Sequence, residues 1–453
     1  NRCFYLNNTN AALEGFTITN GFAAGAVLPD YQGGGVLALV DGGVISNCVI
    51  TGNRAKEGGG VCHGTVRNCG MVNNEGFSSG GGSSRGDIRD CVIAGNVAGA
   101  AGGAHSPQWM EKCLVYGNAA TNGVAGGIGG GEVRRCVITG NRALYNGGGA
   151  SAGNFTFCAF SSNVSVLGNG GAAASASLWG CDVSDNQATN YGQGGGVYSC
   201  YLYNCAIWSN RAYQGGGVFQ LFGRPAYNCT IVGNRASDGG GGTYDAYVYN
   251  GIVYNNHAAQ YSNYYNTVFS YACVSPASGL HAFDADPQFV SESGADFHLM
   301  GSSPCVDAGT NLSAVGVVLD KDGLSRPLDG HDDGTNLWDL GAYEYIHPGA
   351  DSDRDHFKDA DEAAAGTDAT NQYSLLQFEQ AGYVVETNGD GLVIRWQSVL
   401  EKSYRVERST NLAAQAGTPL FTHVPGAPPM NTATDAAAFG SGPWLYRVLV
   451  ERD

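Results

Sequence analysis

The chain has 453 residues, of which 23 are Lys or Arg and 40 are Asp or Glu, giving a formal net charge of −17 at pH 7. Its length accommodates two or three domains, and its negative charge argues against nucleic acid and against an anionic membrane surface as partners. No run of about 18 apolar residues is present, so the sequence predicts no transmembrane segment. Charged residues make up only 14% of the chain and Gly fills 71 positions, so we expect a surface of small polar and aromatic side chains with few ion pairs.

A repeat of 21 to 24 residues organises the first half of the chain. Its marker is a Cys with an Asn five places later, and a fixed period of this size is typical of a solenoid. The Cys positions are Cys48, Cys69, Cys91, Cys113, Cys136, Cys158, Cys181, Cys205 and Cys229. The Asn positions are Asn53, Asn74, Asn96, Asn118, Asn141, Asn163, Asn186, Asn210 and Asn234. Two further units have Gly in the Cys position, from Gly15 to Asn20 and from Gly251 to Asn256.

The apolar positions within each unit alternate in twos, which indicates β-strands rather than helices. Each Cys and the apolar residue two places later should face inward on one strand, and the residues just before Cys should form an outward corner. Gly-Gly-Gly runs at one phase of the units also disfavour helices and indicate tight bends or close backbone approach. We therefore predict an all-β fold: a parallel β-helix of about eleven turns over residues 1–256 and a small β-sandwich further along the chain. Residues 1–20 already have the character of a turn, so we expect the chain as given to begin inside the fold.

Structural roles explain the repeated Asn and Cys residues. Inward Asn residues in register can hydrogen-bond to the turns above and below, which satisfies amides that would otherwise be buried unpaired. An inward Cys acts as a small hydrophobe. Although turns ~4.8 Å apart are within the Cα range of a disulfide, side chains in parallel register do not point at each other as that bond requires. Some disulfides, or a metal site, are the alternatives, and the Cys residues off the ladder are Cys3, Cys62, Cys200, Cys273 and Cys305.

A terminal segment at residues 257–348 has irregular spacing and is rich in Asp and Pro. Its motifs are DADPQF (284–289), SSPCVDAG (302–309) and DLGAYEY (339–345). They resemble the terminal segment of secreted bacterial β-helix proteins called choice-of-anchor Q. The preceding units resemble the repeats of polymorphic outer-membrane-type surface proteins, which are right-handed parallel β-helices. This resemblance implies an exported protein, extracellular or at the cell surface, and implies no single activity.

An acidic linker at residues 349–371 contains a candidate calcium loop. In DSDRDHFKDADE (351–362) the carboxylates have the spacing of an EF-hand-type loop, because a hard cation needs six to eight oxygens and a bidentate acid to close the shell. The predicted ligands are Asp351, Asp353, Asp355, the carbonyl of Phe357, Asp359 and Glu362. His356 departs from the pattern, which has Gly at the sharp turn. The stretch resembles the calcium linkers of secreted bacterial proteins, which implies bound Ca²⁺; a solvated acidic linker is the alternative.

Residues 372–453 contain more charge, less Gly and three alternating runs, LVIRW (392–396), SYRVERS (403–409) and WLYRVLVE (444–451). Short alternating strands over about 80 residues suit a small β-sandwich. The segment resembles the fibronectin-III-like modules that end many exported bacterial proteins, which implies a spacer or sorting role, with carbohydrate contact as a further option.

Outward positions of a β-helix align into columns, and the column two places before Cys ends in four aromatic residues. These are Trp179, Tyr203, Tyr227 and Tyr249. If the corner is exposed, their flat faces form a ladder on which sugars can stack. The alternative is that the rings stabilise neighbouring turns or lie beneath a folded-back part of the chain.

The other half of this column, with its neighbouring phase, is charged and offers the best place for catalysis. The candidates are Asp87, Arg89, Glu111, Glu132 and Arg134. Paired acids can hydrolyse glycosides, although two turns, ~10 Å, separate Asp87 from Glu132. Alternating Arg and Glu also fits plain neutralisation of charge along a ladder. A second Arg column, in which each residue follows a ladder Asn, is interrupted and is expected to be solvated: Arg54, Arg142, Arg211 and Arg235.

Two functional hypotheses follow. The first is an exported cell-surface or matrix protein with a structural, adhesive or self-assembling role, which binds polysaccharide or further copies of itself. Self-assembly would use the ends of the β-helix or its outward apolar residues, Val49, Val92, Leu114 and Val137. The alternative is a secreted polysaccharide lyase or glycoside hydrolase that acts on a face of the β-helix.

Overall fold

The computed structural model describes residues 1–8, 10–38, 43–221, 223–374, 378–386, 389–398, 402–409, 418–427, 430–435 and 445–451. The chain divides into two compact units. The first comprises residues 1–323 and 337–345, and the second comprises 324–336 and 346–453. Of the helices in the described ranges, none combines the length and the apolar character of a membrane-spanning segment.

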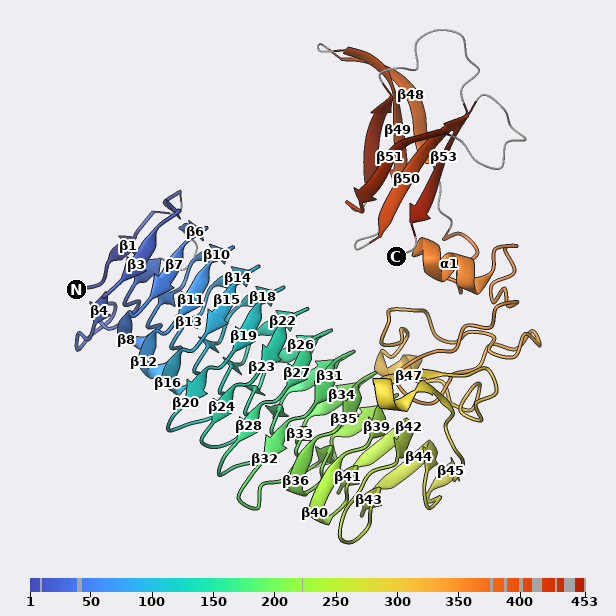
Figure 1. Cartoon of the computed structure of the whole chain (residues 1–453), viewed down its shortest axis with the longest axis horizontal. Coiled ribbons are helices and arrows are strands. Elements are labelled where there is room, and N and C mark those ends of the chain that lie inside the picture. Colours follow the sequence, from blue (N-terminus) through green and yellow to red (C-terminus); the bar gives the residue numbers. More distant parts are fainter. Residues whose placement is uncertain are drawn as a thin grey trace. The chain divides into compact units, whose positions relative to one another are not determined.

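Unit 1 is a parallel β-helix, as predicted (Figure 1). One turn shows the plan: two short strands separated by a corner belong to sheet B, the next strand to sheet C and the last to sheet A. Strands of successive turns pair in parallel and in register, so that Val66 lies between Ile45 and Ile88.

The strands of each sheet follow in chain order. Sheet A contains β1 (Phe4–Leu6), β5 (Val36–Ala38), β9 (Val61–Cys62), β13 (Ser83–Ser84), β17 (Ala104–His105), β21 (Ile128–Gly129), β25 (Ala150–Ser151), β29 (Ala173–Ala174), β33 (Val197–Tyr198), β37 (Val218–Phe219), β41 (Thr243–Tyr244) and β43 (Tyr264–Tyr265). Sheet C contains β4 (Phe22–Ala23), β8 (Arg54–Glu57), β12 (Glu75–Ser79), β16 (Val97–Ala100), β20 (Ala119–Ala120), β24 (Arg142–Ala143), β28 (Val164–Ser165), β32 (Gln187–Ala188), β36 (Arg211–Gln214) and β40 (Arg235–Gly239).

Sheet B has two flanks. The flank before the corner contains β2 (Ala12–Glu14), β6 (Val44–Ser46), β10 (Thr65–Arg67), β14 (Asp87–Arg89), β18 (Trp109–Glu111), β22 (Glu132–Arg134), β26 (Asn154–Thr156), β30 (Ser177–Trp179), β34 (Tyr201–Tyr203) and β38 (Pro225–Tyr227). The flank after the corner contains β3 (Thr17–Thr19), β7 (Val49–Thr51), β11 (Gly70–Val72), β15 (Val92–Ala94), β19 (Leu114–Tyr116), β23 (Val137–Thr139), β27 (Ala159–Ser161), β31 (Asp182–Ser184), β35 (Ala206–Trp208) and β39 (Thr230–Val232). The longer strands β42 (Tyr247–Tyr254) and β44 (Val268–Val274) cover both flanks, and β45 (Leu280–Phe283) pairs with β44. The parallel stack therefore continues into the predicted terminal segment.

The predicted corner lies at the residue directly before each Cys. Asn47, Asp90 and Lys112 have φ angles of 52°, 52° and 51°, in the left-handed region. A left-handed residue reverses the local twist and turns the chain between two extended segments. The outward corner predicted from the break in alternation is therefore confirmed.

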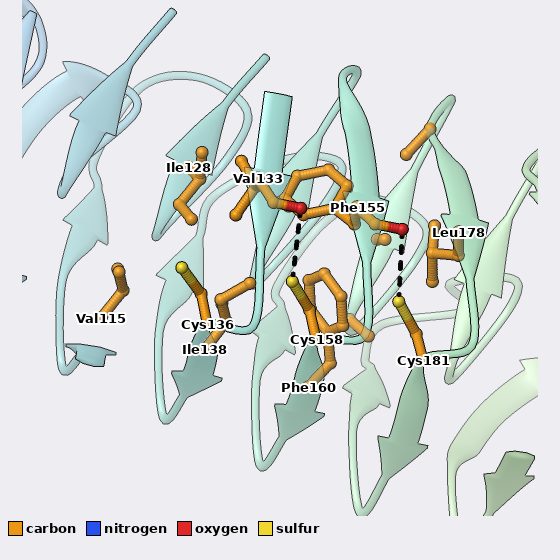
Figure 2. Packing of buried hydrophobic residues seen from close by; sticks show 14 of the residues in the cluster. Val115, Ile128, Val133, Cys136, Ile138, Phe155, Cys158, Phe160, Leu178 and Cys181 are labelled. Atoms are coloured by element: carbon orange, nitrogen blue, oxygen red, sulfur yellow. Dashed lines mark hydrogen bonds between the residues drawn. The ribbon is translucent and has the colours of Figure 1, made fainter. Parts of the chain in front are cut away.

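The interior of the β-helix is filled by the predicted Cys and apolar columns (Figure 2). The nine ladder Cys residues are 0–3% exposed. The Cys158 thiol donates to the Val133 carbonyl oxygen, 3.6 Å away, and the Cys181 thiol donates to that of Phe155, at 3.4 Å. All fourteen Cys residues are free thiols, which agrees with the prediction that parallel register prevents disulfides.

The predicted Asn ladder runs along the inside of the stack. The Nδ2 of Asn141 donates to Oδ1 of Asn163 in the next turn, at 3.0 Å, and to the carbonyl of Val115 in the preceding turn, at 2.9 Å. Its Oδ1 accepts from the backbone N–H of Asn118 at 3.0 Å. Each amide thus satisfies buried backbone groups at the bend between sheets B and C, where the strand ladder is interrupted.

The Gly runs mark places where neighbouring turns approach closely. A Cβ atom at Gly148 would lie 2.3 Å from the carbonyl oxygen of Gly171 in the next turn. Gly147, directly before it, has a φ of 72°. Both reasons proposed for these runs, bends and close backbone approach, therefore apply.

The first turn departs from the predicted register by one residue. Thr17 pairs with Val49, which places Phe16, not Gly15, at the Cys position. The backbone N–H of Gly21 donates to Oδ1 of Asn53 at 2.9 Å, so Gly21 takes the place predicted for Asn20. Asn20 instead adopts a φ of 60° at the left-handed position where the next turn has Gly52, because Asn tolerates the left-handed region better than most residues.

After the last turn, the chain folds back over sheet B. Here β46 (Phe289–Ser291) and β47 (Asp296–Leu299) form an antiparallel pair joined by the 3-10 helix η1 (Glu292–Gly294), and η2 (Ser313–Val315) follows. Phe297, Leu340 and other residues of this segment pack on the outward apolar side chains Ala206 and Ile252 of the last turns.

Unit 2 contains the short helix α1 (Asp359–Ala365), followed by a β-sandwich. One antiparallel sheet contains β48 (Phe378–Glu386), β49 (Gly389–Gln397) and β52 (Met430–Asp435), and the other contains β51 (Thr418–Pro425), β50 (Ser403–Ser409) and β53 (Leu445–Glu451). Ile394 and Trp396 of the first sheet share a core with Tyr404 and Val406 of the second. The three predicted alternating runs are strands, except that Trp444 lies outside the described residues.

Candidate functional site

The aromatic column predicted to bind carbohydrate forms a continuous stack. Trp179 and Tyr203 have ring centroids 3.9 Å apart at an interplanar angle of 9°. The stack continues at 5.5 Å to Tyr227 and 5.2 Å to Tyr249. In-register outward positions one turn apart bring the rings to stacking distance, so the faces of the inner rings are occupied by one another.

The same rings lie beneath a fold of the terminal segment. Tyr203, Tyr227 and Tyr249 pack against a buried cluster of Leu312, Val317 and Trp338, and a Cβ atom at Gly316 would lie 3.6 Å from Trp179. This burial raises the pKa values of Tyr203 and Tyr227. The rings thus lie beneath a folded-back segment, as the alternative interpretation of the sequence expects. Carbohydrate binding by these rings stays a prediction.

The charged candidates lie on the N-terminal half of sheet B in the expected columns. Arg89, Glu111 and Arg134 are in register on three successive strands. The indole Nε1 of Trp109 donates to Oε2 of Glu111 at 3.4 Å, and the guanidinium of Arg134 lies over the same indole at 5.4 Å. Side chains of opposite charge therefore alternate along this face of the sheet, with the Trp109 indole beside Glu111 and Arg134.

Asp87 and Glu132 are brought to the same column, with Trp109 in register between them. Two strand spacings put their backbones ~10 Å apart, and Asn154 Nδ2 donates to Oε1 of Glu132 at 2.5 Å. A glycosidase pair needs a clear gap between the acids, about 5–9.5 Å wide depending on mechanism. Trp109 lies in register between Asp87 and Glu132, in the place of that gap. A catalytic role of Asp87 and Glu132 stays a prediction.

The acidic linker draws the predicted calcium ligands together. Carboxylate oxygens of Asp351, Asp353 and Asp355 lie within 4.8 Å of one another. The backbone N–H of Asp355 donates to Oδ1 of Asp351 at 3.2 Å, and that of Phe357 donates to Oδ1 of Asp355 at 2.8 Å. His356 has a φ of 80°, so the sharp turn that the motif normally assigns to Gly is made here by a residue with a side chain.

The donor set of this loop fits a cation. Oδ2 of Asp353, Oδ2 of Asp355 and Oε2 of Glu362 are buried without a hydrogen-bond partner among the described residues, and Glu362 is only 3% exposed. Burial, followed by the charges of Asp353 and Asp355, raises the pKa of Glu362 to about 7. Asp359 differs from the expectation, because both of its oxygens accept from Ser352, at 2.7 and 2.6 Å. These unpaired carboxylate oxygens are hard ligands of the kind that Ca²⁺ prefers.

A hollow on the outer face of sheet C was not foreseen as a site. It has a volume of about 390 Å³ and is lined by β32, β36, β40 and the turn that follows β32. Its lining includes Gln187, Asn190, Tyr191, Arg211, Tyr213 and Arg235. The signal in the sequence is Arg at equal phase in two consecutive units, which predicts a solvated column. The repeat does not predict the turn that walls the hollow, because that turn is an irregular insertion.

The predicted apolar stripe is exposed on the N-terminal half of sheet B. Val49, Val92, Leu114 and Val137 are 48%, 38%, 37% and 44% exposed. Their column continues through Asp182 to Ala206. The Asp182 carboxylate pairs with Lys321 Nζ of the terminal segment at 2.9 Å, and Ala206 is packed beneath the same segment. One column of the sheet is thus covered in its second half and open in its first.

No family model matches the chain, and none of the curated proteins matches it. Among solved structures, it is similar to pectate lyase Pel9A, at 14% sequence identity and a TM-score of 0.29, over 76% of this chain and 86% of that chain. A likeness this distant says nothing about activity, and the parallel β-helix rests on the strand pairings themselves.

Proposed function

We propose that the chain is an exported cell-surface or matrix protein whose β-helix binds polysaccharide through the hollow on sheet C. The observation that carries the proposal is the combination of side chains around this hollow: two tyrosines beside amide, hydroxyl and guanidinium groups. Sugar rings stack their apolar faces on aromatic side chains and direct their hydroxyls to such polar groups. The resemblance of the repeats and of the terminal segment to exported β-helix proteins supports the location.

Affinity electrophoresis or calorimetry against a panel of soluble polysaccharides tests this proposal. Tyr191→Ala should abolish binding, because Tyr191 is 81% exposed at the rim of the hollow. Tyr145→Ala is the matched control, since Tyr145 is 45% exposed and lies outside the lining. Absence of binding to every polysaccharide, or equal losses in both variants, would overturn the proposal. Assaying the same mixtures for reducing and unsaturated ends, with Glu111→Gln as the comparison, tests the alternative of an enzyme.

Calcium is the second element of the proposal: we infer that the loop at 351–362 binds Ca²⁺ and rigidifies the linker before the β-sandwich. The ion would be held by Asp351, Asp353, Asp355, the Phe357 carbonyl and Glu362. Its positive charge would neutralise the carboxylates. Asp359 would contribute only by exchanging its bonds to Ser352. The role is structural, because a metal that orders a linker stabilises the folded chain by its binding free energy.

Self-association is a second candidate function, favoured by the open apolar stripe. Its column is already used within the chain as a docking surface for the terminal segment, so the same chemistry in the open half suits another copy of this chain. Leu114→Glu should shift the sedimentation of any oligomer to the monomer position, whereas Arg142→Glu, on another sheet, should leave it unchanged. A chain that sediments as a monomer at high concentration would exclude this function.

A further inference from the structure

The hollow on sheet C contains two neighbouring cations that the protein leaves unpaired. Arg211 and Arg235 are in register on β36 and β40, ~4.8 Å apart along the stack, and both are exposed. Within the described ranges, no carboxylate lies at ion-pair distance from either guanidinium. The adjacent Asp238 carboxylate is turned to Gln214 Nε2, which donates to it at 2.8 Å.

The same column shows how the protein neutralises such a charge elsewhere. Arg54 faces Glu75 in the next strand, and its Nε lies 2.8 Å from Oε2 of that carboxylate. At the hollow, the in-register neighbours are instead Gln187 before Arg211 and His257 after Arg235. On a chain of net charge −17, this is a local cationic surface that an anionic ligand would complete.

The wall of the hollow is a turn held in a left-handed conformation. Asn190 and Tyr191 have φ angles of 49° and 65°, and a left-handed Tyr is uncommon and strained. The turn is fixed by Thr189 Oγ1 and Asn190 Nδ2, which donate to the Val166 carbonyl at 2.7 and 2.8 Å. The Tyr191 ring is exposed to solvent and makes a T-shaped contact with the Tyr213 ring, at a centroid distance of 5.1 Å.

We propose that this hollow binds uronic acid residues of an acidic polysaccharide, with Arg211 and Arg235 pairing with sugar carboxylates and Tyr191 stacking on a sugar ring. A guanidinium presents a planar pair of donors that matches a carboxylate. The two arginines follow each other along the stack, so the bound chain runs across the turns. This inference rests on the proposed polysaccharide binding and names its ligand class.

The test measures calorimetric binding of the full chain to oligogalacturonate, its methyl ester, a neutral glucan oligomer and a sulfated oligosaccharide of equal length. We expect oligogalacturonate to bind, and its methyl ester, which lacks the charge, to bind at least tenfold more weakly. Arg211→Gln and Arg235→Gln should each weaken oligogalacturonate binding about tenfold or more. Arg142→Gln should not, because Arg142 is an exposed member of the same column outside the hollow.

Four results would overturn the inference, each in a different way. Equal binding of the acid and its methyl ester, or of the neutral glucan, would leave polysaccharide binding intact and remove the uronate. Tighter binding of the sulfated oligosaccharide through the same two arginines would show that sulfate is the ligand group. An equal loss in Arg142→Gln would show that binding is diffuse electrostatics, while no binding to any oligomer would also remove the proposed function.

Discussion

The Asn ladder makes the sharpest prediction about what holds the β-helix together. Asn141→Ala removes an amide that donates to the Val115 carbonyl and accepts from the Asn118 backbone N–H. Val115 is 0% and Asn118 is 1% exposed, so water does not readily replace the lost partner. An orphaned buried donor or acceptor costs about 1–3 kcal/mol. The Asn118 N–H and the Val115 carbonyl are the two deeply buried backbone groups affected, and from these two alone we expect the free energy of unfolding to fall by about 3 kcal/mol.

Urea denaturation followed by circular dichroism measures this loss. The control is Asn154→Ala, which removes an exposed Asn of the following turn and should change the free energy of unfolding by about 0.5 kcal/mol or less. The m-value should stay constant in both, because neither side chain changes the surface exposed on unfolding. If Asn141→Ala exceeds the control by less than about 1 kcal/mol, the reasoning that the ladder satisfies buried backbone groups is refuted.

Three further outcomes are expected. Titration with Ca²⁺ should raise the Tm of the full chain, and Asp353→Asn should remove most of that rise. The control Asp30→Asn, which changes a residue of unit 1 far from the loop in sequence, should keep the rise. Equal rises in all three proteins would contradict the calcium site. His298 lies between Asp296 and Asp322, at 2.6 and 2.7 Å, and these hydrogen bonds raise its pKa to about 9. Its charged form is thus favoured in the folded state, so its contribution is complete below pH ~6.5 and lost as the pH rises toward 9. Since the His298 side chain is 43% exposed, the free energy of unfolding should fall by about 1 kcal/mol over this range. A free energy of unfolding that is constant between pH 6.5 and 9 and unchanged by His298→Gln would refute this prediction. Trp338→Ala should lower the free energy of unfolding by about 3 kcal/mol. Trp338 is only 4% exposed and packs on the aromatic ladder, so its removal leaves a cavity there. A loss below about 1 kcal/mol would show that the covering segment contributes little to stability.

The sequence alone determined the inside of this protein. A stacked solenoid places equivalent residues at equal depth in every turn, so Cys136 and Asn141 could be assigned to the interior from their period. The corner before Cys followed from the break in alternation, and free thiols followed from the geometry of parallel register. The register failed only in the first turn, where Gly15 offered no side chain to mark its position and Phe16 stands in place of Cys.

The tertiary structure alone decided the outside. Whether the column from Trp179 to Tyr249 faces solvent depends on Leu312, Val317 and Trp338, which are distant in sequence and belong to no repeat. The hollow around Arg211 and Arg235 likewise depends on the turn at Tyr191, which the repeat does not encode. Periodicity reports the positions that every turn must share, because each turn buries them against its neighbours. It is silent on long-range covering segments and on insertions, which belong to one turn only, and these created or closed the candidate sites.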